Sequence, residues 1–228
     1  MKILSIDWDY FFPDSAWYDW GHAETVMYLN MAWQWRVNNR HIKTGKSALT
    51  EYVPTIPKDF WNIVTNDPML FVAESHAAIA TLPMNNSIVT NLDAHHDCGY
   101  GANDDLECGN WAWWMKEHIK EYHLCYPAWR GDGEEAAYRR KPTTIIRELP
   151  APADYDLVFV CRSGCWTPPW YDRQFRGWLK RSGMKPRYMD EHVTTVRQPA
   201  TLKQAKLMKE QLDNRNKYLF QLQKEKVA

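Results

Sequence analysis

Four short apolar runs constrain the fold of this chain more than any other feature of its sequence. They are four to six residues long, rich in β-branched and aromatic side chains, and lie at 2–6, 70–73, 87–92 and 156–161. Runs of this kind are typical of strands that are covered on both faces of a sheet. Between them we expect helices at about 22–37, 58–66, 109–122 and 170–182. The alternation predicts an α/β fold with an open, mainly parallel sheet and helices on both faces.

The C-terminal segment differs in kind from the rest of the chain. Thr201 and Gln204 form a capping-box pattern, and apolar residues follow at steps of three and four. We therefore predict one α/β domain over 1–198 and a helical extension over 199–228. Residues 201–228 hold seven Lys or Arg against three Asp or Glu, so this segment carries +4 and the remainder −4. A helix packed on its own domain is the favoured interpretation, while a homo-oligomer seam or a partner contact stays open.

Charge and hydropathy exclude several classes of protein. Lys plus Arg and Asp plus Glu both number 28, so bulk charge gives no reason to expect binding to nucleic acid or to an anionic membrane. No apolar run approaches the roughly 20 residues that cross a bilayer, and acidic residues interrupt the first eleven residues, where a signal peptide would be apolar. The five cysteines include no C-x-x-C pair, so we expect reduced thiols. We expect a cytoplasmic protein.

Metal-ligand residue types follow three of the four predicted strands. The first run leads into Asp7-Trp8-Asp9, the second into Glu74-Ser75-His76, and the third into Asp93-Ala94-His95-His96-Asp97. Because the carboxyl ends of parallel strands share one edge of a sheet, these side chains are expected to meet there. The predicted ligands are Asp7, Asp9, His76, Asp93, His95 and Asp97.

Electrostatics turns this gathering into a prediction of two metal ions. Four carboxylates brought together would repel one another, and some would be forced to take up protons. Two divalent cations would balance the four negative charges, with both imidazoles neutral. Oxygen-rich ligation with two histidines favours Mn²⁺ and leaves Zn²⁺ or Fe²⁺ open. Since a pair of cations can lower the pKa of a shared water, hydrolysis of a small-molecule substrate is the chemistry we expect.

The same segments resemble a known enzyme family. Residues 91–97, NLDAHHD, look like the D-A-H-x-D signature of the ureohydrolases, and residues 5–9, SIDWD, look like the start of their S-x-D-x-D signature. In those enzymes the second motif follows the first, so the order here resembles a circular permutation. Glu74-Ser75-His76, Asn110-Trp111 and Asp9-Tyr10-Phe11 are similar to elements of an uncharacterised arginase-like group. The resemblance implies an arginase/deacetylase-like fold.

The resemblance also implies roles for the predicted ligands. Asp93 and Asp7 would bridge the two metal ions, and Asp97 would orient the attacking hydroxide as well as bind metal. Cys108-Gly109-Asn110, which follows the motif at 91–97, is similar to the family's S-G-N segment, and Asn110 and Trp111 are candidate substrate contacts.

Two further candidates come from position alone. His96 lies between two predicted ligands, so it is either a catalytic residue of the site or a side chain that faces the opposite side of the chain. Arg162 follows the fourth run and could hold a substrate carboxylate, with a structural ion pair as an equal alternative.

We therefore expect a binuclear hydrolase that acts on a non-peptide C–N bond, in a guanidino, amidino or acetylamine group, through attack by metal-bound hydroxide. Ala112 stands where arginases have a proton-shuttling histidine, which disfavours arginine itself as the substrate. The alternative is a catalytically silent protein that keeps the metals for stability and binds a partner through its Trp-rich surface and basic C-terminal helix. Phosphoesterase chemistry at a two-metal centre is a third interpretation.

Overall fold

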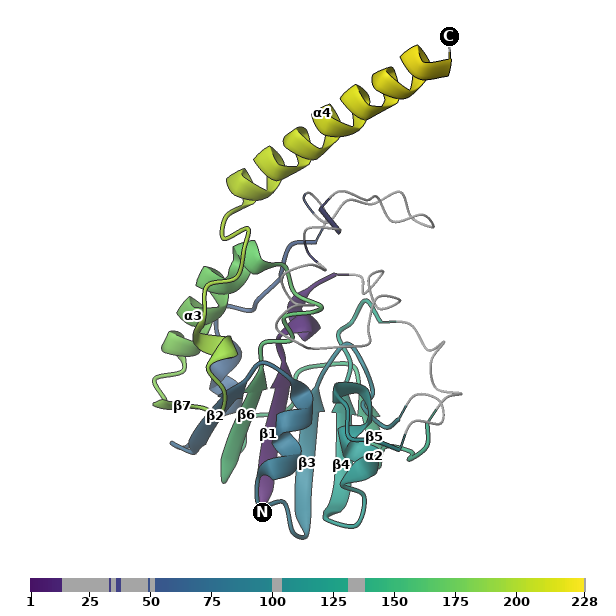
Figure 1. Ribbon diagram of the computed structural model, residues 1–228. Helices are drawn as coiled ribbons and strands as arrows, with labels where there is room; N and C mark the ends of the chain where they lie inside the picture. Colours follow the sequence, from purple (N-terminus) through teal and green to yellow (C-terminus); the bar gives the residue numbers. More distant parts are fainter. Residues whose placement is uncertain are drawn as a thin grey trace.

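Seven parallel strands form one sheet at the centre of the molecule (Figure 1). The computed structural model describes residues 1–13, 33, 36–37, 49, 52–99, 104–130 and 138–227, with side chains as far as 221. In spatial order the strands are β5, β4, β3, β1, β6, β2 and β7. Their bounds are β1 Lys2–Asp7, β2 Met69–Ala73, β3 Ser87–Leu92, β4 Ile119–Cys125, β5 Thr144–Ile146, β6 Leu157–Cys161 and β7 Pro186–Tyr188. The predicted open parallel α/β sheet is confirmed, and the four apolar runs are β1, β2, β3 and β6.

Three α-helices and several 3-10 helices accompany the sheet in the described part of the chain. The α-helices are α2 Trp111–Trp114, α3 Asp172–Arg181 and α4 Leu202–Val227. The 3-10 helices are η1 Trp8–Phe11, η3 Phe60–Ile63, η4 His76–Thr81, η5 Cys108–Asn110, η7 Pro169–Tyr171 and η8 His192–Thr194. Helix α3 confirms the prediction for 170–182, whereas only the short η3 forms within 58–66. The helix predicted over 22–37 lies outside the described residues, apart from residues 33, 36 and 37.

The helix predicted over 109–122 is wrong for its second half. Helix α2 ends at Trp114, and the chain enters β4 at Ile119. Strand β4 pairs with β3 on one side and with β5 on the other, and its burial alternates from Glu121 to Leu124. Pairing on both edges therefore overrides the local helical spacing of the apolar residues.

Successive residues of each central strand pack into two different core layers. Leu4 and Ile6 of β1 belong to the layer that contains Trp178 of α3, and Ile3 belongs to the layer that contains Ile79 of η4 and Trp111 of α2. This alternation is the two-residue period of a strand that is covered on both sides. Helices on both faces of the sheet are thus confirmed.

Strand β1 lies where the chain changes its direction across the sheet. After β1 the chain forms β2, beyond β6 on one side, and then crosses to form β3 on the other side of β1. The carboxyl ends of β1 and β3 are direct neighbours, with Ile6 opposite Leu92. In open α/β sheets, sites form in the crevice at such a switch point. The motif that begins the chain is therefore brought beside the motif that follows β3.

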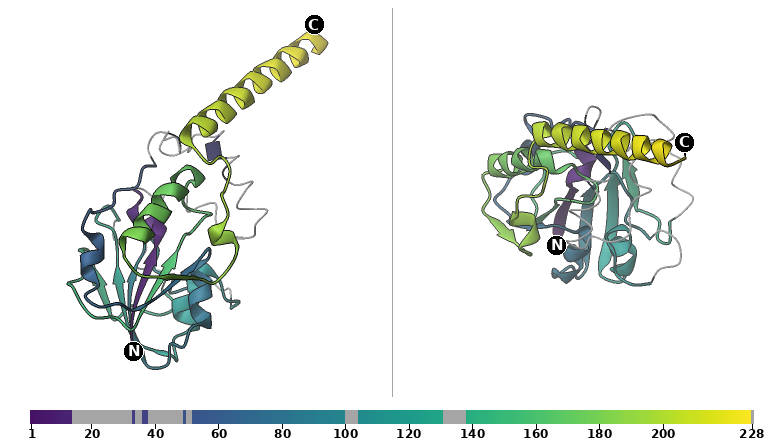
Figure 2. Two further views of the ribbon diagram at one scale, coloured as in Figure 1. Left: turned by 90° about the vertical axis from the view of Figure 1, so that its left-hand side faces the viewer. Right: turned by 45° about the horizontal axis from the view of Figure 1, so that its top comes forward.

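Helix α4 begins with the predicted capping box. The backbone N–H of Thr201 donates to Oε1 of Gln204 (3.1 Å), and the backbone N–H of Gln204 donates to Oγ1 of Thr201 (3.2 Å). Figures 1 and 2 show the helix projecting away from the α/β domain. Among the described residues, no helix is both long and apolar enough to cross a membrane.

Candidate metal centre

All six predicted ligands converge at the carboxyl ends of β1, β2 and β3. Asp7 ends β1 and caps η1, since its Oδ1 accepts a hydrogen bond from the backbone N–H of Asp9 (2.9 Å). His76 opens η4, and the other three ligands follow β3. The two aspartate-bearing segments touch directly, because the backbone N–H of Ala94 donates to Oδ1 of Asp9 (3.3 Å) across 85 positions of sequence.

A first group of donors surrounds Nδ1 of His76. This nitrogen lies 3.0 Å from Oδ2 of Asp97, 3.1 Å from Oδ2 of Asp93 and 3.3 Å from Oδ2 of Asp7. Metal–ligand bonds of about 2.1 Å at octahedral or tetrahedral angles place neighbouring ligand atoms about 3.0 to 3.4 Å apart. The nitrogen is buried and makes no hydrogen bond. The spacing and the unpaired donor therefore fit a shared cation.

A second group surrounds Nδ1 of His95. It lies 2.9 Å from Oδ2 of Asp9 and 3.6 Å from Oδ1 of Asp93. That oxygen of Asp9 is also buried without a hydrogen bond. Asp93 gives Oδ2 to the first group and Oδ1 to the second, so its carboxylate has the geometry of a bridge between two cations. Asp7, also expected to bridge, faces the first group only.

Hydrogen bonds from neighbouring side chains hold the ligands in these positions. Oγ of Ser5 lies 2.6 Å from Nε2 of His76, so Nε2–H can donate to the hydroxyl while Nδ1 faces the carboxylates. Nδ2 of Asn91 donates to Oδ2 of Asp93 (3.1 Å) and to the hydroxyl of Tyr122 (2.9 Å). Partners of this kind orient metal ligands and set which histidine nitrogen is available.

Burial and mutual repulsion perturb the protonation of these groups. Burial, followed by the charges of Asp9 and Asp93, raises the pKa of Asp7 well above its usual value. Burial and then the charge of Asp93 raise the pKa of Asp97 to about 7. Burial alone would lower the pKa of His95, but the Asp9 and Asp93 carboxylates outweigh it and the pKa is raised. Protons therefore occupy the positions that cations would take, and binding of cations would release them.

The same competition acts on the first group. Burial lowers the pKa of His76, but the charge of Asp97 and the close approach of the three carboxylates to the ring raise it well above its usual value. Burial would raise the pKa of Asp93, yet the two imidazoles on either side of it hold that pKa well below the usual range. Asp93 is thus the carboxylate that stays ionised between both groups.

The centre meets solvent on the side of His95. The His95 side chain is 15% exposed, whereas the exposed fraction is 5% or less for the other five ligands. The ring of Trp166 lies 5.2 Å from the His95 ring, centroid to centroid. Trp166 therefore borders the opening.

The loop that carries Trp166 is tightly packed. Ser163 has a positive φ of 54°, and an added Cβ at Gly164 would lie 1.9 Å from Oε1 of Glu74. Arg197 donates to the carbonyl oxygens of Gly164 and Thr167. The loop is thus held in one conformation over the centre.

No protein-family model, no curated protein and no solved structure matches this chain. The resemblance to the ureohydrolases therefore stands on the motif residues alone.

The structure gives other surroundings to the remaining site candidates. His96 is fully buried against Tyr138, and burial lowers its pKa to about 3, so it is a neutral imidazole. Trp111 has no exposed surface, and its Nε1 donates to Oδ2 of Asp97, so it supports a ligand rather than facing a substrate. The Asn110 side chain bonds to the backbone of Glu107 and Asp105 within its own loop.

Arg162 lies in a buried ion cluster. Its Nε donates to Oε2 of Glu74 (2.7 Å), its Nη1 lies 3.3 Å from Oδ2 of Asp172, and its Nη2 donates to the carbonyl of His192. The side chain is 1% exposed. The geometry favours the structural ion pair over a contact with substrate.

Two features of the centre were not predicted from the sequence, namely the support of the ligands by Ser5 and Asn91 and the position of Trp166. Ser5 and Asn91 each lie two residues before an aspartate ligand in a strand, so they point to the same side as Asp7 and Asp93. That spacing could have identified them. Nothing in the sequence indicated that Trp166 would reach His95.

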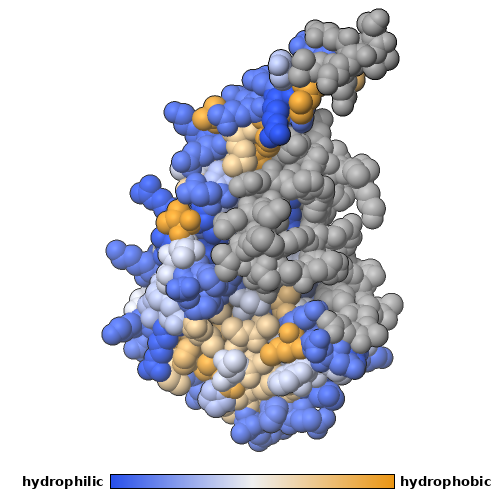
Figure 3. Space-filling view, in the orientation of Figure 1, coloured by the Kyte–Doolittle hydropathy of each residue, from blue (hydrophilic) through white to orange (hydrophobic). Residues whose placement is uncertain are grey.

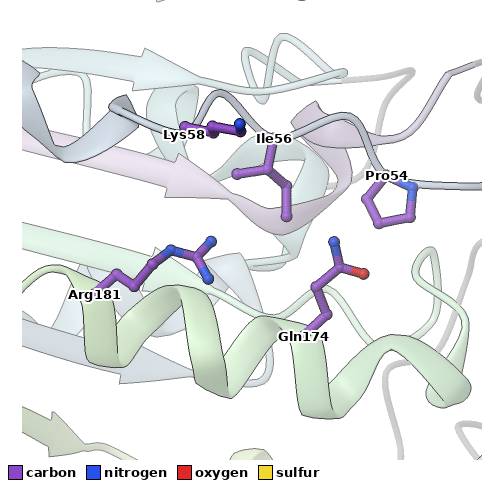
Figure 4. A pocket seen from close by; sticks show the side chains of 5 residues that line it. All are labelled: Pro54, Ile56, Lys58, Gln174 and Arg181. Carbon is purple, nitrogen blue, oxygen red and sulfur yellow. The ribbon is translucent and has the colours of Figure 1, made fainter.

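A surface pocket of about 430 Å³ lies apart from the centre (Figure 4). It is lined by Pro54, Ile56, Lys58, Gln174 and Arg181. None of the six ligands contributes to it, so it has no part in the chemistry of the centre.

All five cysteines lie in the described part of the chain, and none forms a disulfide. This agrees with the expectation of reduced thiols.

Proposed function

We propose that this chain is a binuclear metal-dependent hydrolase that acts on a non-peptide C–N bond of a small molecule, in a guanidino, amidino or acetylamine group. The observation that carries the proposal is the Asp93 carboxylate, which gives one oxygen to each of two buried histidine–carboxylate groups. A bridging carboxylate between two such groups is the arrangement expected of a two-metal site.

Two divalent cations, Mn²⁺ by preference for an oxygen-rich donor set and otherwise Zn²⁺ or Fe²⁺, would supply an activated water and polarise the bond under attack. The chain's own residues supply the positions. Ser5 keeps Nδ1 of His76 facing the carboxylates, and the Trp111 indole fixes Oδ2 of Asp97. By the resemblance to the ureohydrolases, Asp97 would also orient that water.

Burial of the centre favours a small substrate. Five of the six ligands are almost sealed, so the substrate would enter past His95 and Trp166. Exclusion of water from such a site strengthens the electrostatic interactions within it. The resemblance to arginases and deacetylases then favours a trigonal carbon bonded to nitrogen as the group attacked.

The test measures metal content and product release on the same preparations. We expect about two equivalents of Mn²⁺ per chain after loading, with clear loss in Asp7→Asn and in His95→Ala. The control is Asp67→Asn, since Asp67 is an exposed aspartate outside the centre. Release of urea, ammonia or acetate from a panel of guanidino, amidino and acetylamine compounds would support the hydrolase. Metal binding without any such product would contradict it.

The near-complete burial of the ligands also favours a second function. A protein that keeps two cations for stability alone needs no opening, and His95 is the only ligand with appreciable exposure. This metal-stabilised binding protein would show the same metal content and a large fall in Tm on chelation, with no turnover. Generic phosphate esters belong in the substrate panel, because two-metal centres also hydrolyse phosphoesters.

A further inference from the structure

The exposed charges of helix α3 are all positive. Four cationic residues of this helix are exposed, namely Arg173, Arg176, Lys180 and Arg181. Its single acidic residue, Asp172, is buried and pairs with Arg197. Hydrophilic residues predominate on the side of the molecule where α3 lies (Figures 1 and 3). A surface that carries charge of one sign attracts ligands of the opposite sign.

The pocket of about 430 Å³ lies between this helix and the segment at 54–58. Gln174 and Arg181 are seven positions apart, which is two turns of a helix, so they lie on the same side of α3. Figure 4 shows their side chains reaching from α3 toward the segment that holds Ile56 and Lys58. Pockets for small organic molecules have volumes of about 300 to 1,000 Å³. The space therefore fits a small molecule.

The polar side chains of this pocket have no partner among the described residues. Lys58 and Arg181 form no ion pair there, and the amide of Gln174 forms no hydrogen bond. No described residue that lines the pocket is acidic, and the exposed Asp59, next to Lys58 in sequence, does not line it. The pocket thus presents two positive charges and an amide donor without a negative charge of its own.

The rest of the pocket wall is apolar. Pro54 is buried and Ile56 is half-buried. Figure 4 shows the Ile56 side chain pointing toward α3, between the ends of Gln174 and Arg181. An apolar wall beside a few polar groups is typical of sites for small organic ligands, in which the polar groups fix the orientation.

We propose that this pocket binds a small organic anion through its phosphate or carboxylate group. The guanidinium of Arg181 can donate two parallel hydrogen bonds to such a group, and the ammonium of Lys58 adds a second positive charge. Gln174 donates its amide N–H, and the apolar part of the ligand lies against Pro54 and Ile56. None of the six metal ligands lines the pocket, so this site does not depend on the hydrolase proposal.

Calorimetric titration of the full chain tests the proposal with butyl phosphate and butyrate. We expect saturable binding of at least one of them, with a Kd on the order of 1 mM. Inorganic phosphate lacks the apolar part and should bind about tenfold more weakly than butyl phosphate. Butanol lacks the charge and should not bind. The titrations are made with and without Mn²⁺ loading, and binding to the pocket should be the same in both.

Two double variants separate the pocket from the general charge of the helix. Lys58→Gln with Arg181→Gln should raise the Kd about tenfold or more, because both charged partners of the anion are lost. The matched control is Arg173→Gln with Lys180→Gln, which removes two charges of the same sign from exposed positions of α3 that do not line the pocket. It should leave the Kd within about twofold of the wild type. Circular dichroism verifies that both variants keep the fold.

Several results would overturn the proposal. Absence of saturable binding of both organic anions up to about 20 mM would do so. An equal rise of the Kd in the two double variants would assign the binding to diffuse charge on α3. Binding that requires Mn²⁺ would assign it to the metal centre, and butanol binding as tightly as the anions would show an apolar cavity only. Inorganic phosphate binding as tightly as butyl phosphate would contradict an organic ligand.

Discussion

Ser5→Ala probes whether the histidine support acts on cation binding. The hydroxyl lies 2.6 Å from Nε2 of His76, and both residues are almost fully buried. Its removal leaves Nε2 without a partner and frees the ring to turn Nδ1 away from Asp7, Asp93 and Asp97. Loss of such a supporting hydrogen bond weakens metal affinity about 10- to 100-fold, or about 1.4 to 2.8 kcal/mol. Isothermal titration with Mn²⁺ measures the change directly.

A second buried serine provides the control for this variant. Ser87 is fully buried at the start of β3, and its hydroxyl makes no hydrogen bond. Ser87→Ala removes the same atom from the same sheet, at the edge away from the ligands, and should leave Mn²⁺ affinity unchanged. If Ser5→Ala bound Mn²⁺ as tightly as Ser87→Ala, the claim that this hydroxyl orients His76 would be refuted.

Three further predictions follow from the geometry of the centre and its loop. Asp93→Asn should abolish binding of both cations, whereas Asp9→Asn should lose one equivalent, because only Asp93 belongs to both groups. Metal analysis after dialysis measures the cations that remain bound. Equal losses in the two variants would contradict a bridging role for Asp93. Gly164→Ala should destabilise the fold by about 1 to 3 kcal/mol, because its Cβ would lie 1.9 Å from Oε1 of Glu74. The control, Gly177→Ala, has open space around it in α3 and should stabilise the fold by about 0.5 to 1 kcal/mol. Urea unfolding measures the free energy of unfolding of both variants. The raised pKa values of His76 and His95 mean that both rings hold protons near neutral pH without cations, so Mn²⁺ should displace protons and bind more tightly as pH rises. Calorimetric titration in buffers of different ionisation enthalpy measures the number of protons released. An Mn²⁺ affinity that is independent of pH would argue against this displacement of protons.

The central strands were predictable because burial on both faces makes them largely apolar. Strands β1, β2, β3 and β6 are of this kind, and they occupy the middle of the sheet. Strands β5 and β4 lie toward one edge, and β7 forms the other edge. Strands β5 and β7 have three residues each, too few to give a pattern. Strand β4 carries Lys120, Glu121 and His123 among its apolar residues.

The wrong helix over 109–122 has a specific cause. Trp111, Met115, Ile119 and Tyr122 are spaced by four, four and three residues, which is the period of one helix face, and all four are buried. Trp111 lies in α2 and Met115 directly follows it as the C-cap, whereas Ile119 and Tyr122 belong to β4. Spacing alone cannot distinguish a single helix from a short helix followed by a strand.

The convergence of the six candidate ligands was predictable because it depends on residue type and strand order, but the supporting roles depend on side-chain direction. His95 and His96 are adjacent in sequence, yet one ring faces Asp9 and the other faces Tyr138. Trp111 was expected beside the substrate and lies instead beneath Asp97. These directions are set by packing between distant segments, which local spacing does not encode.

Two neighbouring clusters of buried charge differ in how far the chain itself compensates them. In the cluster of Arg162, Arg197, Glu74 and Asp172, two guanidinium groups face two carboxylates, and Arg197 bonds both oxygens of Asp172. At the metal centre four buried aspartates face only two imidazoles, and within the described part of the chain no Lys or Arg pairs with them. Even with both imidazoles protonated, two negative charges remain uncompensated unless carboxyl groups are protonated. The complete pairing of charges in one cluster and the deficit in the adjacent one support the proposal of a cation site, and the deficit of four charges with neutral imidazoles would match two divalent ions.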